Sequence, residues 1–128
     1  MTVRITDKTF DFTRTYYLAG PMTGYPDFNY AAFGQIKQDL ESAGVQVASP
    51  HTLPWPDSHE GDEELWQVMM RSALKLLLDC DGIILMRGWT NSRGALVEYN
   101  IAAALRLPSY FLDGKFLIHM HDPERSGK

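Results

Sequence analysis

The 128-residue chain has one cysteine, Cys80, so it can form no internal disulfide and no cysteine-based metal cage. No apolar run approaches the roughly 20 residues that a membrane-spanning helix needs. The first ten residues, MTVRITDKTF, lack the apolar stretch of a secretory signal peptide. We therefore expect a cytoplasmic protein of a reducing compartment that has no membrane partner.

Positive charge is also scarce, with 12 Lys and Arg residues against 16 Asp and Glu and a net charge of −4. Without a global positive field, a nucleic acid polymer is not an expected partner. His51 and His59 lack a third ligand at metal-site spacing. We expect them to be ordinary loop histidines, and we expect no metal and no other cofactor.

The length and the 45% hydrophobic content suit one domain over residues 1–128, with an N-terminal extension (1–13) and a flexible tail (121–128). Short apolar runs alternate with helical periods, which is typical of βαβ units. The predicted α/β fold is a wound, flavodoxin- or Rossmann-like, mainly parallel five-stranded sheet with flanking helices. The predicted strands are Arg14–Ala19, Val45–Ser49, Gly82–Met86, Ser109–Leu112 and Lys115–Met120, the last two joined by a tight turn at Asp113-Gly114.

Three helices are predicted from apolar positions three and four residues apart. The first follows Asn29 as its cap and ends at Gly44. The second covers Glu63 to Leu78 after an Asp62 cap, and the third covers about Ala95 to Leu105. The expected apolar stripe of the second helix is Leu65, Met69 and Leu76. The early segment Val3–Phe12 is predicted as a further hairpin.

Ligands of wound sheets bind beyond the carboxyl ends of the strands, where the strand order reverses, here between the first and third strands. The loops that leave those strands are GPMTGYPDF and RGWTNSRG. In the second loop, Ser92, Arg93 and Gly94 stand at a helix start, where free N–H groups and the helix dipole attract an anion. A phosphate or a sugar hydroxyl could bind there; alternatively, Ser92 caps the helix and Gly94 serves a turn.

Glu98 is expected near the end of the first turn of that helix, where the dipole stabilises the ionised carboxylate. An ionised, anchored carboxylate beside a sugar site is what a glycosyl nucleophile requires. The alternative is a simple dipole partner on a solvated face.

Aromatic and basic residues near the same loops also have two interpretations. Phe28 and Trp89 could stack on a base or could brace the loops. Arg71, Arg87 or Arg93 could bind a phosphate or could face water.

Two segments of the chain resemble the nucleoside 2-deoxyribosyltransferase-like superfamily, particularly a branch of small proteins often encoded by phages. The segment YLAGPMTGYPDFN is similar to the opening strand and loop of that superfamily. The segment DCDGIILMRGWTNSRGALVEYNIAAALRLP is similar to its strand, Ser-x-Gly loop and catalytic-glutamate helix. With the intervening residues, the resemblance covers most of Tyr16 to Leu112. It implies nucleotide metabolism and assembly into a homodimer or larger homo-oligomer.

The resemblance also implies roles for individual residues. Glu98 matches the nucleophile that attacks the sugar C1′ and releases the base, and Tyr17 matches the aromatic hydroxyl that helps orient this carboxylate. Asp81 is interpreted as structural because it precedes its strand. The positions expected to line the substrate site are Gly20, Pro21, Met22, Phe28, Gly88, Trp89, Ser92, Arg93 and Gly94.

One position departs from the family pattern. Related sequences carry an aspartate on the second helix that handles the proton on the leaving base, and here that position is Ala73. The rise of a helix places residue 73 level with the cleft, so the missing group is close to the chemistry. Asp27, Asp57 and His59 are candidate replacements. Two functions therefore stay open: a hydrolase or transferase that cleaves or exchanges the base of a nucleoside or nucleoside monophosphate, and a catalytically weak protein that sequesters or senses a nucleotide.

Overall fold

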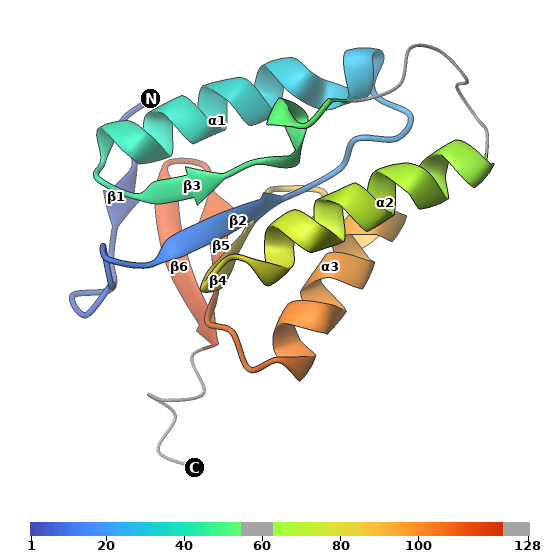
Figure 1. Ribbon diagram of the computed structural model, residues 1–128. Helices are drawn as coiled ribbons and strands as arrows, with labels where there is room; N and C mark the ends of the chain where they lie inside the picture. The colour runs from blue at the N-terminus through green and yellow to red at the C-terminus, as the bar shows by residue number, and fades with distance from the viewer. Residues whose placement is uncertain (55–62, 122–128) are drawn as a thin grey trace.

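The computed structural model describes residues 1–54 and 63–121. These residues form an α/β fold in which a six-stranded sheet is flanked by three helices (Figure 1). The strands are β1 (Arg4–Ile5), β2 (Thr15–Ala19), β3 (Gln46–Ala48), β4 (Gly82–Leu85), β5 (Ser109–Asp113) and β6 (Phe116–His121). The helices are α1 (Tyr30–Ser42), α2 (Glu63–Leu78) and α3 (Arg93–Ala104), with short 3-10 helices η1 (Pro26–Asn29), η2 (Pro50–Thr52) and η3 (Trp89–Asn91).

The strand order is β1-β6-β5-β4-β2-β3. Strands β3, β2, β4 and β5 run parallel, and β6 returns antiparallel to β5 through a tight turn at Gly114-Lys115, one residue later than predicted. The wound, mainly parallel sheet is therefore confirmed. The chain leaves β2 for β3 on one side and then crosses to β4 on the other, so the strand order reverses between β2 and β4 as expected.

The sheet has six strands rather than five because the N-terminal segment adds β1 in parallel beside β6. The predicted Val3–Phe12 hairpin is wrong. After two paired residues, the Asp7 side chain accepts a hydrogen bond from the Thr9 N–H at 3.0 Å and turns the chain. Phe10 then packs into the core, with its ring 4.9 Å from that of Tyr16. A local side-chain turn and an aromatic anchor thus replace a second strand.

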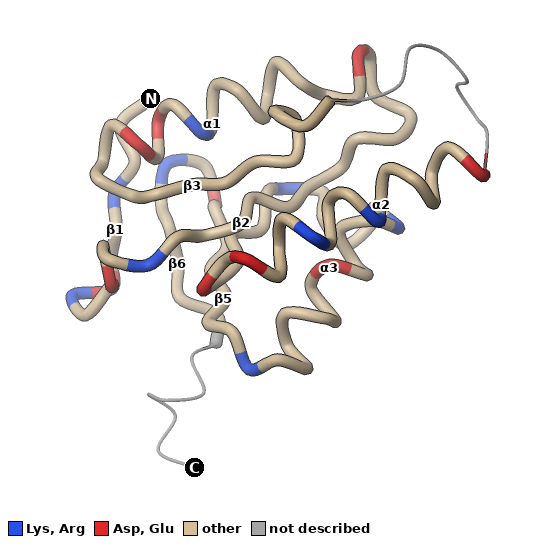
Figure 2. Tube along the Cα trace, viewed as in Figure 1, with Lys and Arg blue, Asp and Glu red and all other residues tan. Residues whose placement is uncertain are grey.

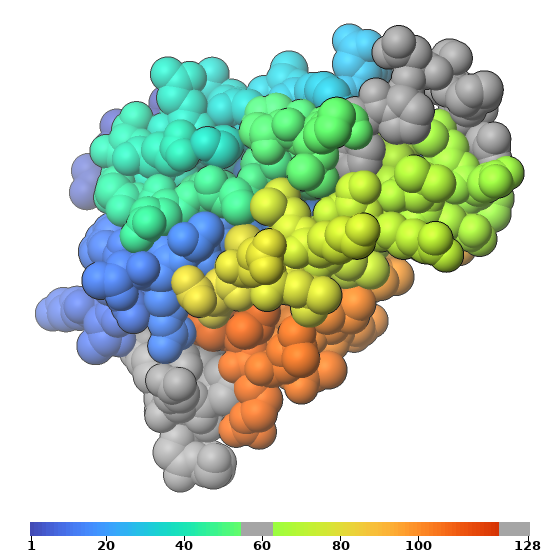
Figure 3. All heavy atoms as spheres, viewed as in Figure 1, coloured from blue at the N-terminus to red at the C-terminus, as the bar shows by residue number. Residues whose placement is uncertain are grey.

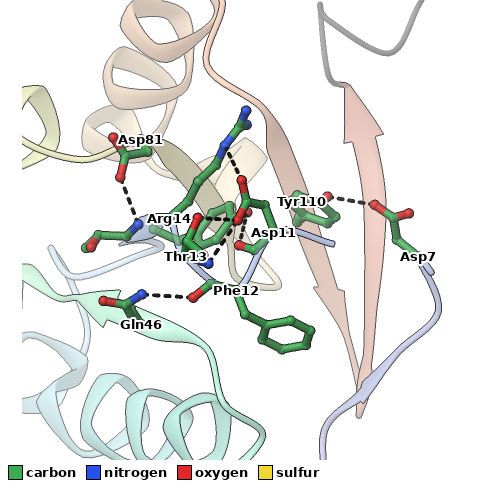
Figure 4. Close-up of polar contacts among 10 residues, drawn as sticks. Asp7, Asp11, Phe12, Thr13, Arg14, Gln46, Asp81 and Tyr110 are labelled. Atoms are coloured by element: carbon green, nitrogen blue, oxygen red, sulfur yellow. Dashed lines mark hydrogen bonds and ion pairs between the residues drawn. The ribbon is translucent and has the colours of Figure 1, made fainter. Parts of the chain in front are cut away.

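The start of β2 is held by side chains from neighbouring segments, as Figure 4 shows. Asp81 accepts a hydrogen bond from the Thr15 N–H at 2.9 Å, and the Gln46 amide donates to the Phe12 carbonyl at 2.8 Å. The structural interpretation of Asp81 is confirmed. Its contact lies at the end of β2 that is opposite to the loops of the expected site.

The core has two layers, one on each face of the sheet (Figure 1). Helix α1 covers one face, with Phe33 and Leu40 fully buried as its apolar spacing predicts. Helices α2 and α3 cover the other face, and in the space-filling view α2 fills the band between the α1 side and α3 (Figure 3). Every residue of β4 is buried between the layers, as expected of a central parallel strand.

Two local expectations are wrong. Asn29 precedes α1 in the left-handed conformation, and its amide donates to the Pro21 carbonyl at 3.0 Å instead of capping the helix. On α2, the fully buried positions are Ala73 and Leu77, while the predicted stripe is only half-buried. Leu65 and Met69 line the cavities beside the first half of α2, whereas Leu76 packs against the core but stays partly exposed.

Charged positions are scattered along the described trace rather than gathered on one face (Figure 2). Within the described residues, 1–54 and 63–121, no helix is both long and apolar enough to cross a membrane.

Candidate active site

Two adjacent cavities lie beyond the carboxyl ends of β2 and β4, beside the start of α2. The outer cavity measures about 460 Å³, and the inner cavity, which reaches Glu98, measures about 40 Å³. Both cavities are lined by Thr23, Trp66, Met69, Ser92 and Gly94. The cavities are therefore neighbours, and we call the inner one, which reaches the buried Glu98, the floor of the site.

Glu98 lies at this floor, on the second turn of α3, and is only 5% exposed. The Tyr17 hydroxyl donates a hydrogen bond to Glu98 Oε2. Tyr17 is fully buried on β2, and because side chains alternate along a strand it faces the α2–α3 layer while Tyr16 faces the α1 layer. The alternation of side chains along β2 thus places the Tyr17 hydroxyl against the Glu98 carboxyl group on the core side.

Burial raises the pKa of Glu98 to about 8, and the hydrogen bond from Tyr17 only partly opposes this effect. The pKa of Tyr17 is also raised, first by burial and then by Glu98, so its hydroxyl stays a donor. The expectation that the helix dipole stabilises the ionised form of Glu98 is therefore wrong. The dipole acts mainly within the first turn, Glu98 stands on the second turn, and desolvation outweighs the remaining effect.

Close packing shapes the loops around Glu98. A Cβ atom on Gly20 would lie 2.7 Å from Met86 Sδ, and one on Gly94 would lie 3.1 Å from Met70 Sδ. Ser92 Oγ accepts a hydrogen bond from the Ala95 N–H at 3.2 Å, so Ser92 caps α3 as well as lining both cavities. The two glycines let the β2 loop close onto β4 and let α3 approach α2.

An ion pair spans the mouth of the outer cavity. Arg93 donates from both terminal nitrogens to Glu63, at 2.8 and 3.0 Å, and its guanidinium carbon lies 3.6 Å from the ring centroid of Trp66. The hydrogen bond from Arg93 lowers the pKa of Glu63. Both side chains stay more than half exposed. The other candidate arginines lie apart, since Arg87 pairs with Asp113 and Arg71 is on the exposed face of α2.

The cavities bring together most of the residues that the sequence singled out. Of the expected substrate-site positions, the inner cavity contains Gly20, Met22, Ser92 and Gly94, and the outer cavity contains Pro21, Phe28, Gly88, Ser92, Arg93 and Gly94. Trp89 lines neither cavity. Its ring packs 5.0 Å from that of Tyr99 on α3, so it braces the loop.

Helix α2 supplies most of the lining residues that sequence reasoning missed. Trp66, Met69 and Met70 stand three or four residues apart and lead to Ala73, the α2 position that was expected at the cleft. This spacing was the available signal. The other missed lining residues are Thr23, Tyr25, Glu63, Leu65, Asn91 and Ala95.

The expected position of Ala73 at the cleft is confirmed, since Ala73 lines the inner cavity together with Glu98 and is 4% exposed. Of the candidate replacements for the missing acid, Asp27 is exposed and lines neither cavity. Asp57 and His59 lie outside the described residues, as does the expected cap Asp62.

The described segments contain no group of three His, Cys, Asp or Glu side chains placed to hold a metal ion. The Nδ1 atom of His51 lies 2.6 Å from Ser49 Oγ. Cys80 is buried, and burial raises the pKa of its thiol to about 11.

The fold is similar to that of a known deoxyribosyltransferase. The structure is similar to that of a 2-deoxyribosyltransferase from the psychrotolerant bacterium Bacillus psychrosaccharolyticus, with a TM-score of 0.57 and 19% sequence identity over 78% of this chain and 74% of the other. Residues 14–111 match the family described as "Domain of unknown function (DUF4406)", and the chain belongs to this family. No curated protein matches the sequence.

Proposed function

We propose that this protein is a nucleoside-modifying enzyme that cleaves or exchanges the base of a nucleoside or nucleoside monophosphate, with Glu98 as the nucleophile. The observation that carries the proposal is the pairing of Glu98 with Tyr17 at the floor of a cavity in a deoxyribosyltransferase-like fold. A buried carboxyl group with one hydrogen-bond donor and an open path to a cavity suits attack on a bound sugar.

The chemistry is a displacement at the anomeric carbon. Glu98 forms a bond to C1′ while the C1′–N bond breaks, and the base leaves with the electron pair and takes up a proton. Water or a second base then attacks C1′ and releases the carboxylate. The Tyr17 hydroxyl holds Oε2 during both steps, because its own raised pKa keeps it protonated.

The outer cavity has room for the rest of the substrate. Its volume of about 460 Å³ falls within the range of sites for small ligands. The rings of Tyr25, Phe28 and Trp66 supply flat apolar surface of the kind on which a base stacks. We assign the sugar to the junction of the cavities beside Ser92 and Gly94.

The second candidate, a catalytically weak nucleotide-binding protein, is favoured by one pair of observations. The pKa of about 8 keeps most Glu98 side chains protonated at pH 7, and a protonated carboxyl group is a poor nucleophile. Ala73 meanwhile offers no acid for the departing base. Together these features favour slow turnover at neutral pH.

The test is incubation with a panel of nucleosides and their 5′-monophosphates between about pH 6 and pH 9, with chromatography for free base. A Glu98 nucleophile predicts base release that rises with pH and levels off above about pH 8, as the carboxyl group ionises. Ligand binding without base release at any pH would favour the binding protein. A rate that falls with pH would contradict the role of Glu98 as nucleophile and would indicate a general acid.

A further inference from the structure

The pair of Glu63 and Arg93, called here the mouth pair, joins the first turns of two different helices over the outer cavity. Both terminal nitrogens of Arg93 are engaged with the two carboxylate oxygens of Glu63, and its flat face lies on Trp66. The guanidinium is therefore already occupied in the geometry with which arginine binds a phosphate.

Glu63 has two independent reasons to be ionised. Arg93 lowers the pKa of Glu63 through hydrogen bonds, and the first turn of a helix favours negative charge. Among the described residues that line the outer cavity, Glu63 and Arg93 are the only charged ones. Among these described residues the two charges cancel, and the one cation is matched by the one carboxylate.

We propose that Glu63 is a specificity-determining residue that makes the site favour an uncharged nucleoside over the corresponding 5′-monophosphate. This inference rests on the proposed function. A phosphate that approached Arg93 would have to displace the Glu63 carboxylate or lie beside it, and like charges at that range repel. A neutral 5′-hydroxyl meets no such penalty. The expected role of Arg93 as a phosphate ligand then emerges only when Glu63 is neutralised.

The expected effect is moderate because both side chains are more than half exposed and solvent screens them. One charged hydrogen bond gained by a phosphate corresponds to about tenfold in affinity. Added salt should weaken the discrimination by the wild-type protein, since screening reduces the repulsion between Glu63 and the phosphate.

The experiment is calorimetric titration of several 2′-deoxynucleosides and their 5′-monophosphates into four proteins: wild type, Glu63→Gln, the double variant Glu63→Gln with Arg93→Gln, and the control Glu41→Gln. Glu41 is an exposed glutamate that pairs with Lys37 on α1 and lines neither cavity. We expect wild type and Glu41→Gln to bind nucleosides more tightly than the corresponding 5′-monophosphates. Glu63→Gln should shift the affinity ratio about tenfold toward monophosphates, and the double variant should lose that shift.

Either of two results from these titrations would overturn the inference while leaving the proposed function intact. One is a wild-type preference for monophosphates, and the other is an affinity ratio that Glu63→Gln leaves unchanged although nucleosides bind. Repeating the wild-type titrations in about 0.5 M NaCl gives a readout that needs no variant, and a salt-independent ratio would also contradict the role of Glu63. Failure of every nucleoside and monophosphate to bind would overturn the proposed function as well.

Discussion

Glu98 and Glu63 line two adjacent cavities, and each lies near the start of a helix, yet their environments move their pKa values in opposite directions. Burial raises the pKa of Glu98 to about 8, whereas the hydrogen bonds from Arg93 lower the pKa of Glu63. The inner carboxyl group has one neutral donor, Tyr17, and almost no contact with water. The outer carboxylate has a full positive charge beside it and is more than half exposed.

This contrast shows that proximity to a helix start does not decide the charge of a carboxyl group. The helix dipole is worth a fraction of a kcal/mol at an exposed site, whereas desolvation of a buried charge costs several times more. Two glutamates within one candidate site are thus suited to the different roles that we propose, the inner one as a reactive group and the outer one as a fixed charge.

The largest expected effect is that of Glu98→Gln. The amide keeps the size of the side chain and can still accept a hydrogen bond from Tyr17, but it cannot form the glycosyl ester. Base release should fall by about 10³-fold or more. The measurement is chromatography of free base at pH 8.5, and wild-type turnover in this variant would remove Glu98 from the mechanism.

Glu98→Gln also tests whether ionisation of the buried Glu98 destabilises the folded protein. In the folded protein the pKa of Glu98, about 8, lies above its value in the unfolded chain, so the folded state holds an extra proton between about pH 4.5 and pH 8. The contribution of Glu98 to stability should be most favourable below about pH 4.5 and should decline as the pH rises toward 8. Glu98→Gln should therefore raise the free energy of unfolding at pH 8.5 by a few kcal/mol, seen as a higher Tm, and should change the Tm little at pH 4.5.

Glu63→Gln is the matched control for this stability measurement. The lowered pKa of Glu63 gives any stabilisation the opposite pH dependence, present above about pH 4.5 and lost as the pH falls. This variant should show no gain in Tm at pH 8.5. An equal gain in both variants would mean that the two carboxyl groups do not differ as the structure indicates.

An intermediate effect is expected of Tyr17→Phe, which removes the donor that favours ionised Glu98. The pKa of Glu98 should rise further, so the pH at which base release is half-maximal should increase. The rate should fall by about 10- to 100-fold, the scale of one hydrogen bond to a charged group. The pH dependence of kcat is the measurement.

Tyr16→Phe is the control for this variant, because Tyr16 is the adjacent buried residue and its hydroxyl donates to the Asp11 carbonyl in the other core layer. It should leave the pH dependence in place. A shift of the same size in Tyr16→Phe would attribute the Tyr17 effect to general loss of packing.

The smallest change in activity is expected of Ala73→Asp, which places an acid in the inner cavity. Beside Glu98 and almost without solvent, a new carboxyl group should stay protonated near pH 7 and could donate to the departing base. Base release should rise about tenfold with ligand affinity nearly unchanged. Ala73→Asn has the same shape without the acid and should give no increase. Equal rates in the two variants would contradict the proton-donor role.

Local sequence patterns predicted much of the fold, and the family resemblance indicated the centre of the candidate site. The apolar periodicity of α2 set its ends at Glu63 and Leu78, and the continuous run of β4 marked it as a buried central strand. These patterns are local and recur every two to four residues. The glycine-rich loops after β2 and β4 marked the edge of the sheet where the cavities lie, because parallel strands share their carboxyl ends. The family resemblance indicated the Glu98 position.

Contacts between distant segments decided the rest. The pairing of β1 with β6 joins residues more than 100 positions apart, and the contact of Glu63 with Arg93 depends on how α2 docks against α3. The charge of Glu98 depends on the same packing. Local sequence supplied a glutamate near a helix start, for which an ionised form was expected, but burial beneath α2 raised its pKa to about 8. Desolvation depends on every group that excludes water, so only the tertiary structure could decide it.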